Sequence, residues 1–546
     1  MIGTLFYLIG GIGLFLLGMS LLTDGLKSYA GDALSRALVR FTGKPSKAFV
    51  SGALVTALVQ SSSATTVTVI GFVSAGLLTF PQALGVVIGA SLGTTSTGWI
   101  VSVLGLKISL GYYALPLIGA GALMKLLFPG RWKSLGLALA GFGLIFVGIQ
   151  HLQIGMEGLS GIFRLSDLPA SGLIAHLVIM GIGLIMTIVM QSSSAAVATT
   201  LTALYTQSVS FEQAALLVIG AAVGTTVTGA MAAIGASVST KRTALAHVLF
   251  NLATGLIAVL LLPFFLRVIL WAQIYLGLDP GATSLAAFHT LFIALGVILF
   301  LPFTEKFSLW IERLLPEKGP TLTRHLDPTV LNVPAVALEA TRRALSETAA
   351  GICGLIHLRL EGRPASVDNS CVGELPQAQD AIKTFFAKIP PVADVEPLSQ
   401  LRVTQMHAIE HLERLRDYLQ PPAVLQRIQE DDSALSEARR IVLSVLKEAQ
   451  AGLQTGITTE GPIDSGDWLA GVEEKSLTLS ELHRRSRPAV LKKTAIDGAP
   501  MVALQTLDAI RWMDRVGYHV WRIANYLAGD GSAEPSYSDD RGYPVR

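Results

Sequence analysis

Charged residues are scarce in the first three hundred positions of this 546-residue chain and dense after them. Only 15% of all residues are charged, 51% are hydrophobic, and the mean hydropathy is +0.55. This composition argues against an ordinary soluble globular protein and favours a membrane protein. The change near Pro302 divides the chain into a membrane part and a soluble part.

The chain also has few cysteines and little excess positive charge. The two cysteines, Cys353 and Cys371, both lie in the charged part. Two cysteines make no disulfide framework, and a cytosolic location of that part fits them best. The formal net charge is only +2, and no basic stripe accompanies it, which argues against a nucleic-acid partner.

Motifs typical of enzymes and of secretory leaders are missing as well. We find no nucleotide-binding loop, zinc-ligand spacing or nucleophile elbow, so we expect no enzyme and no organic cofactor. Residues 1–22 lack the basic start and small-residue cleavage site of a signal peptide. We therefore expect them to form a membrane helix.

The apolar part contains one polar motif that occurs twice. The letters QSSSA begin at Gln60 and again at Gln191, and GTTSTG at Gly93 matches GTTVTG at Gly224. Segments 60–98 and 191–229 align without a gap, with about half of the positions identical. Lipid cannot satisfy polar groups, so the motif is expected to line a protein-buried or water-filled site.

Seven segments are apolar and long enough, or nearly so, to span a membrane: 5–22, 82–104, 112–128, 135–152, 212–236, 243–270 and 284–301. Segments 46–78 and 172–209 are each centred on QSSS. The apolar run on either side of the motif is about 11–18 residues, too short to span twice. We expect each to form a re-entrant hairpin with QSSS at its tip.

The repeat also predicts the architecture of the membrane part, residues 1–304. Repeat 1 covers about 1–130, repeat 2 about 131–271, and the last span is 284–301. Each repeat crosses the membrane an odd number of times, so the second inserts upside down, as in inverted-repeat transporters.

Basic residues predict the orientation of these spans. They concentrate in loops on one side, at 27–47, 125–133, 241–242 and 306–313. The positive-inside rule then predicts a multi-pass protein of the cytoplasmic membrane, with its N-terminus outside and its soluble part in the cytosol.

The soluble part is expected to be helical, which makes the whole fold all-α. A linker at 305–330 precedes a helical bundle at 331–528, and the polar tail 529–546 is expected to be disordered. Apolar residues at three- and four-residue spacing predict helices over 333–361, 376–388, 397–419, 422–453, 468–496 and 501–527.

The hairpin tips carry the predicted site. The N-terminus of a half-helix in mid-membrane offers free N–H groups to an anion. Serine hydroxyls would add donors around a tetrahedral oxyanion: Ser61, Ser62, Ser63, Ser192, Ser193 and Ser194. Two facing hairpins would hold one anion between them.

Oxygen ligands for a hard cation such as sodium are also present. They come from Gln60, Gln191, Ser192, Thr94, Thr95, Thr225 and Thr228. Neither repeat core holds a lysine or arginine, so co-bound cations would balance the anion, which points to cation-coupled symport. Protons would require an intramembrane carboxylate, and Asp24, Glu157 and Glu212 fall near span ends.

Several residues have two interpretations. Gly93, Gly98, Gly224 and Gly229 serve helix packing or the site with equal weight, whereas packing alone does not account for a duplicated QSSS. His247 and Asn251 form either an interhelical hydrogen-bonding pair or a gate, and His289 is interpreted as structural.

Carboxylates in the soluble part also have two interpretations. Glu413 and Asp417 share a helix face and suit a divalent metal, but local pairing with Arg414 and Arg416 is the favoured alternative.

On the two QSSS motifs, the paired GTT segments and HVLFN at 247–251, the chain resembles the type II sodium/phosphate cotransporters and their bacterial members. The match covers about 10–301. The resemblance implies phosphate and sodium as substrates and places in the site Gln60, Ser61, Ser62, Thr94, Gln191, Ser192, Ser193, Thr225 and Thr228. Ser91 and Ala222 stand where the family has asparagine, and the acidic residue of some members is missing.

The soluble part resembles a PhoU-type helical domain. Glu413 and Asp417 match its metal-binding Glu-x-x-x-Asp pattern, and Asp514 begins a second copy, where Tyr518 replaces the expected aspartate. This resemblance implies a divalent metal there and a weakened second copy.

Together these features predict sodium-coupled symport of inorganic phosphate by alternating access through the bilayer. The helical domain would regulate transport, contact a cytosolic regulatory protein or form a homodimer. Two alternatives stay open: a membrane-anchored phosphate sensor without net transport, and a symporter of another small oxyanion such as arsenate or sulfate.

Overall fold

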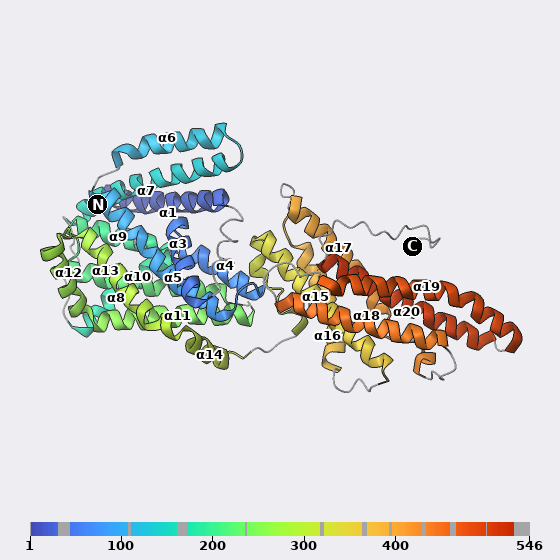
Figure 1. Cartoon of the computed structure of the whole chain (residues 1–546). Helices are drawn as coiled ribbons and strands as arrows, with labels where there is room; N and C mark the ends of the chain where they lie inside the picture. The colour runs from blue at the N-terminus through green and yellow to red at the C-terminus, as the bar shows by residue number, and fades with distance from the viewer. Residues whose placement is uncertain are drawn as a thin grey trace. The chain divides into compact units, whose positions relative to one another are not determined.

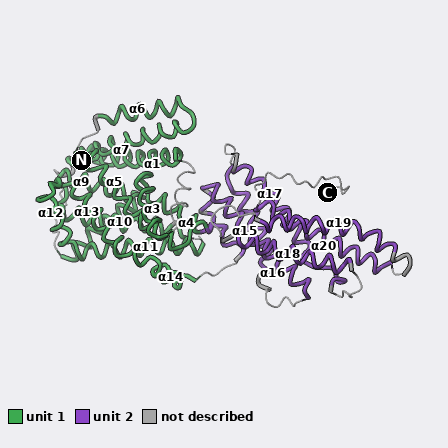
Figure 2. The backbone as a smooth tube through the Cα atoms, viewed as in Figure 1, with its two compact units in different colours: residues 1–73, 77–318 green, residues 74–76, 319–546 purple. Residues whose placement is uncertain are grey.

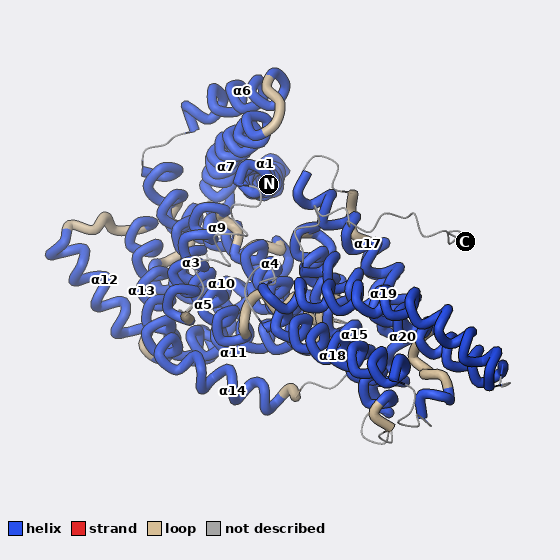
Figure 3. Tube along the Cα trace, turned by 45° about the vertical axis from the view of Figure 1, so that its right-hand side comes forward, coloured by secondary structure: helices blue, strands red, loops and turns tan. Residues whose placement is uncertain are grey.

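The structure is a computed structural model that describes residues 2–30, 44–107, 111–160, 172–234, 237–316, 321–362, 369–391, 396–426, 433–458, 466–497 and 500–528. Every regular element in these ranges is a helix, as Figure 3 shows. The chain forms two compact units, coloured separately in Figure 2: unit 1 is 1–73 with 77–318, and unit 2 is 74–76 with 319–546.

Unit 1 contains the membrane part. Its α-helices, labelled in Figure 1, are α1 Ile2–Ala30, α3 Pro45–Val59, α4 Ser62–Ser74, α5 Phe80–Trp99, α6 Gly111–Leu127, α7 Arg131–Ser160, α8 Leu173–Met190, α9 Ser193–Tyr205, α10 Phe211–Ala232, α11 Val238–Leu260, α12 Leu262–Leu276, α13 Ala282–Phe300 and α14 Thr304–Leu314. The π-helical η1 Ile100–Lys107 continues α5. Seven stretches of the described residues are long and apolar enough to cross a membrane, so unit 1 is a multi-pass membrane unit.

The seven spans differ in part from those predicted. Leu173–Met190, expected to be a hairpin arm, has the length and hydropathy of a span, whereas Tyr113–Leu127 falls among the shorter apolar helices. The segment 243–270, predicted as a span, is divided between α11 and α12, and α11 has the length and hydropathy of a span. The segment breaks at Leu261 because Pro263 in the first turn of α12 has no N–H to continue the α11 ladder.

The ends of the other elements also shift. The predicted linker 305–330 contains α14, which belongs to unit 1. The helix predicted over 422–453 is a 3₁₀ turn at Ala423–Gln426 followed by α18 from Ser433. The helix predicted over 376–388 begins earlier, at Asn369. The predicted tail 529–546 lies outside the described residues.

The two QSSS segments have the same local succession of elements. Helix α3 ends at Gln60 and α4 begins at Ser62; α8 ends at Gln191 and α9 begins at Ser193. A third helix then follows, α5 or α10, and each begins with a capping box, Thr79 with Gln82 and Ser210 with Gln213. The repeated sequence thus produces repeated helix starts and stops.

Glycines hold the third helix of each segment close to the first. A Cβ added to Gly52 of α3 would lie 2.2 Å from the Val86 carbonyl oxygen of α5. Gly183, at the matching position of α8, would place a Cβ 2.1 Å from the Leu217 carbonyl oxygen of α10. Only a residue without a side chain allows this approach, which is how small residues drive helix packing in lipid.

Contacts of this kind assign two of the four glycines that had two interpretations to helix packing. A Cβ at Gly93 would meet the Ala53 carbonyl oxygen at 2.4 Å, and one at Gly224 would meet Thr187 Cβ at 2.7 Å, so both are packing positions. A Cβ added to Gly98 would make only ordinary van der Waals contacts, the nearest at 3.6 Å. A Cβ added to Gly229 would lie beside the His247 ring.

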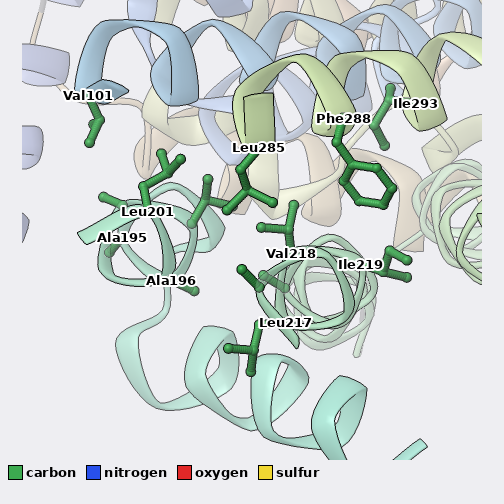
Figure 4. Packing of buried hydrophobic residues seen from close by; sticks show 14 of the residues in the cluster. Val101, Ala195, Ala196, Leu201, Leu217, Val218, Ile219, Leu285, Phe288 and Ile293 are labelled. Carbon is green, nitrogen blue, oxygen red and sulfur yellow. The ribbon is translucent and has the colours of Figure 1, made fainter. Parts of the chain in front are cut away.

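The core of unit 1 is built around α9, α10 and α13. Figure 4 shows Ala195 and Leu201 of α9, Val218 and Ile219 of α10, and Phe288 of α13 in one apolar cluster. The QSSS tip of α9 is therefore attached to a well-packed helix.

Unit 2 is a bundle with its own hydrophobic core. Its long helices are α15 Pro334–Leu360, α16 Asn369–Ala387, α17 Glu396–Asp417, α18 Ser433–Thr458, α19 Gly466–Asp497 and α20 Pro500–Ala528. A histidine pair lies between α17 and α20: His411 Nδ1 and His519 Nδ1 are 2.9 Å apart, and the rings of Tyr418 and Tyr526 surround them.

The environment of this pair disfavours the imidazolium form. Burial, then the neighbouring His519 and Arg522, lower the pKa of His411; burial, then Arg515 and Arg414, lower the pKa of His519. Both histidines are therefore neutral in the folded unit near pH 7.

The glycine contacts predict that Gly183→Ala destabilises unit 1 by about 1–3 kcal/mol, since the new methyl group must push α8 away from α10. Gly181→Ala is the matched control, because a Cβ there meets nothing within 4 Å. Thermal unfolding of the purified full chain in detergent measures both. Equal midpoints for the two variants would contradict the packing argument.

The histidine pair predicts that unit 2 loses stability in acid. Below the ordinary histidine pKa of 6.5 the unfolded chain binds protons that the folded pair does not, so the free energy of unfolding falls as the pH falls. The protection of α17 and α20 against hydrogen exchange in the full chain, measured relative to the rate of the unfolded chain at the same pH, should fall between pH 7 and pH 5, and should fall less in His519→Gln. His357→Gln is the control, because His357 lies on α15 with its Nε2 3.5 Å from Glu361, and it should change the protection as the wild type does.

Candidate functional site

Each QSSS tip is a helix break built on a glutamine in the left-handed conformation. Gln60 has φ 57° and ψ 29°, and Gln191 has φ 53° and ψ 23°. A residue with a Cβ adopts this region at a cost of about 1 kcal/mol. The chain thus turns at the same place twice, and the following serines start a new helix.

The first serine after each glutamine caps the new helix. Ser61 Oγ accepts a hydrogen bond from the Ala64 N–H, and Ser192 Oγ accepts one from the Ala195 N–H, each at 3.2 Å. A serine cap occupies one of the free N–H groups at a helix start and leaves others for a ligand. A serine hydroxyl that accepts here still has its own hydrogen to donate.

Gln60 joins the first tip to the GTT segment of α5. Its Nε2 donates to Ser96 Oγ at 3.0 Å, and its Oε1 accepts from Thr97 Oγ1 at 2.9 Å. Thr97 Oγ1 also lies 3.4 Å from Ser194 Oγ on α9. One buried network therefore contacts both hairpins.

Thr97 is not among the residues predicted from the sequence, although the repeat points to it. The gap-free alignment pairs Thr97 with Thr228, which was predicted. Thr95, which was predicted as a sodium ligand, instead donates to the Leu92 carbonyl oxygen and accepts from Thr290 of α13 at 3.1 Å.

The second tip does not reproduce this network. Gln191 is exposed, and its Nε2 donates to the Ile188 carbonyl oxygen of its own hairpin. Thr228 donates to the Thr225 carbonyl oxygen of its own helix. Val227 stands where the first copy has Ser96, so the hydroxyl that would accept from the glutamine is missing.

A cavity in unit 1 brings serines of both tips together. Its walls are Ser62 of α4, Ser91 and Thr94 of α5, Ser193 and Val197 of α9, Ala222 and Thr225 of α10, His247 and Asn251 of α11, and His289 and Ile293 of α13. Four of the predicted phosphate and sodium ligands thus line one space, Ser62, Thr94, Ser193 and Thr225, together with the predicted gate residues His247 and Asn251. None of the lining residues is a lysine, arginine, aspartate or glutamate.

The other predicted phosphate and sodium ligands do not line the cavity. Ser63 is exposed, Ser194 is buried beside Thr97, and Gln60 is 8% exposed. Ser91 and Ala222, the two departures from the family pattern, both face the cavity. Asn251 donates to the His247 carbonyl oxygen at 2.9 Å, within α11.

The structure does not assemble the predicted metal site of unit 2. Among the residues that it describes, no three histidine, cysteine or acidic side chains come together to hold a metal. Glu413 forms an ion pair with Lys383, Asp417 is exposed, and Asp514 accepts hydrogen bonds from Ser480 at 2.8 Å and His483 at 3.1 Å. These carboxylates have protein partners or face solvent.

Comparison with known proteins agrees with the motifs at the tips. The family model described as Na+/Pi-cotransporter matches residues 14–153, which contain the first tip and the GTT segment of α5. The Bacillus subtilis protein YqeW, which is uncharacterised, is 34% identical over 313 residues, 56% of this chain and 96% of that protein. The chain belongs to the Na+/Pi-cotransporter family.

Two further relatives align with this chain over different lengths. A relative named putative inorganic phosphate export protein YjbB, from Escherichia coli, is 28% identical over 82% of each chain. Human sodium-dependent phosphate transport protein 2B is 35% identical over 107 residues, 19% of this chain and 15% of that protein. No solved structure matches significantly.

The network around Gln60 predicts that Thr97→Val destabilises the protein by about 1–3 kcal/mol. The change keeps the shape of the side chain but leaves Gln60 Oε1 buried without its donor. Thr228→Val is the matched control, since the Thr228 hydroxyl bonds only to its own helix. Thermal unfolding in sodium-free and phosphate-free detergent buffer measures both, and an equal loss in the two variants would contradict the asymmetry.

Proposed function

We propose that this protein carries inorganic phosphate across the cytoplasmic membrane together with sodium, by alternating access. One observation carries the proposal: serines from both QSSS tips, Ser62 and Ser193, line the same cavity. Hydroxyl donors and helix N-termini suit a tetrahedral oxyanion, and the names of the E. coli and human relatives supply its identity as phosphate.

Sodium coupling is proposed from the charge of the cavity. The lining offers oxygen ligands such as Thr94, Thr225 and Asn251 but no fixed charge. An anion in such a place requires a companion cation, and hard cations prefer oxygen ligands. The human relative is named sodium-dependent, which supports sodium as that cation.

The direction of transport is set by the gradients in this proposal. The E. coli relative is named an exporter, and a symporter runs in either direction because its cycle is reversible. Net export of phosphate is therefore a second candidate, favoured by that name. A phosphate sensor without flux and a carrier of arsenate or sulfate are the remaining alternatives.

Unit 2 is proposed to be cytosolic and to regulate transport, to bind a cytosolic regulatory protein or to pair with a second copy. Its separate core supports a domain that folds as its own body. With an odd number of spans, seven, the N-terminus then lies on the outer side of the membrane. The carboxylates Glu413, Asp417 and Asp514 have no part in this proposal.

The proposal predicts sodium-dependent phosphate flux in proteoliposomes that contain the purified protein. Radiolabelled phosphate should follow a sodium gradient in both directions, and potassium should not replace sodium. Ser193→Ala, which removes a hydroxyl from the cavity wall, should lower flux at least tenfold. Ser28→Ala is the control, because Ser28 of α1 is exposed and pairs with Ser134.

Three outcomes of this measurement oppose the proposal. Phosphate binding without flux in either direction would support the sensor. Flux or binding with arsenate or sulfate but not with phosphate would mean a different anion. Flux that is equal in sodium and in potassium would remove sodium as the coupling ion.

A further inference from the structure

Two histidines from different helices reach the substrate cavity. His247 of α11 is 5% exposed and His289 of α13 is 4% exposed, and both line the cavity with Ser62 and Ser193. From the sequence, His289 was interpreted as structural and His247 as part of either a hydrogen-bonding pair or a gate. Because both histidines line the cavity that we propose to bind phosphate, they are candidates for contact with the substrate.

Each histidine has a ring nitrogen without a protein partner. The Nδ1 atoms of His247 and His289 are buried, and neither makes a hydrogen bond to another described residue. An unpaired buried polar atom costs about 1–3 kcal/mol, and lipid offers no water to offset it. Two such atoms on residues that line one cavity indicate that a group from outside the protein satisfies these imidazoles.

Neighbouring residues hold both rings in place. The His289 ring stacks on Phe292, with centroids 5.5 Å apart and an interplanar angle of 26°. A Cβ on Gly229 would lie 3.1 Å from His247 Nδ1, so glycine at this end of the second GTT segment leaves room for the ring. The rings are therefore positioned by packing and do not depend on hydrogen bonds from the protein.

The cavity presents no other group that can change its charge near neutral pH. Helices α5 and α13 carry no aspartate, glutamate, lysine or arginine. The other titratable or charged groups on α11 itself and on the described elements packed against α11 and α13 do not line the cavity. They are Lys107, Tyr205, Glu212, Lys241, Arg242, Arg267, Tyr275, Glu305, Lys306, Glu312 and Arg313. The two imidazoles are the titratable groups among the residues that line the cavity.

We propose that His247 and His289 form a proton-binding pair of the substrate cavity, so that a proton is taken up with the oxyanion. An anion favours the charged form of an imidazole beside it. The proton comes from solution as phosphate binds, stays on a ring nitrogen, and returns to solution when phosphate leaves. This inference rests on the proposed function, and it adds a proton to sodium as a source of compensating charge.

The test counts protons bound per phosphate. Isothermal titration calorimetry of inorganic phosphate into the purified full chain, with saturating sodium, is run at pH 7 in two buffers with different ionisation enthalpies. We compare the wild type with His247→Gln, His289→Gln and the double variant. Phosphate exchanges a proton of its own near this pH, and this contribution cancels in the differences.

We expect the double variant to take up fewer protons per phosphate than the wild type, by up to one. His151→Gln of α7 is the control, since His151 Nδ1 bonds to the Val147 carbonyl oxygen and the residue does not line the cavity. In proteoliposomes with an internal pH dye, phosphate flux should move protons in the wild type and fewer protons per phosphate in the variants.

The outcomes separate this inference from the proposed function. Phosphate that neither binds nor moves in the wild type would overturn both. Phosphate that binds with the same proton count in the wild type and in the variants would overturn the proton pair and leave phosphate transport standing. If the double variant does not fold, the two single variants decide the question by the same count.

Discussion

Backbone groups that are freed where a helix stops need partners that lipid cannot supply, and unit 1 has two such stops among its apolar helices. Gln60 and Gln191 end α3 and α8 in the left-handed conformation, and the new helices begin almost at once. Serine caps satisfy part of the free backbone. The rest must face protein, water or a ligand, which is why the tips and the cavity coincide.

The tips stay in place because the helices around them approach closely. Gly52 and Gly183 let α5 and α10 pass with their backbones nearly in contact with α3 and α8. The core helices α9, α10 and α13 add large buried side chains such as Phe288 and Phe292. Small residues thus set the distance between neighbouring helices, and large side chains fill the core of unit 1. The polar tips are held in place by this packing.

The two copies of the motif have the same backbone but different side-chain contacts. Gln60 is held by Ser96 and Thr97, whereas Gln191 is exposed and bonds only within its own hairpin. One substitution, Val227 in place of a serine, removes the polar partner in the second copy. The two tips therefore differ in how their glutamines are held, although their backbones turn in the same way.

Much of this molecule followed from the sequence by itself. The apolar and charged halves predicted a membrane unit and a helical unit, because lipid and water select different compositions. The duplicated QSSS and GTT letters predicted where the polar tips would form, because polar residues in lipid need a site to line. Helix ends were less certain, as the break at Leu261 shows.

Only the tertiary structure decided which of these residues meet. It brought Ser62, Thr94, Ser193 and Thr225 to one cavity and left Ser63 exposed, although all five belong to the same motifs. It also placed His247 and His289 there and kept Glu413, Asp417 and Asp514 from assembling a metal site. A motif specifies the chemistry of a segment, whereas contact between segments far apart in the chain depends on how helices pack, and no local pattern contains that information.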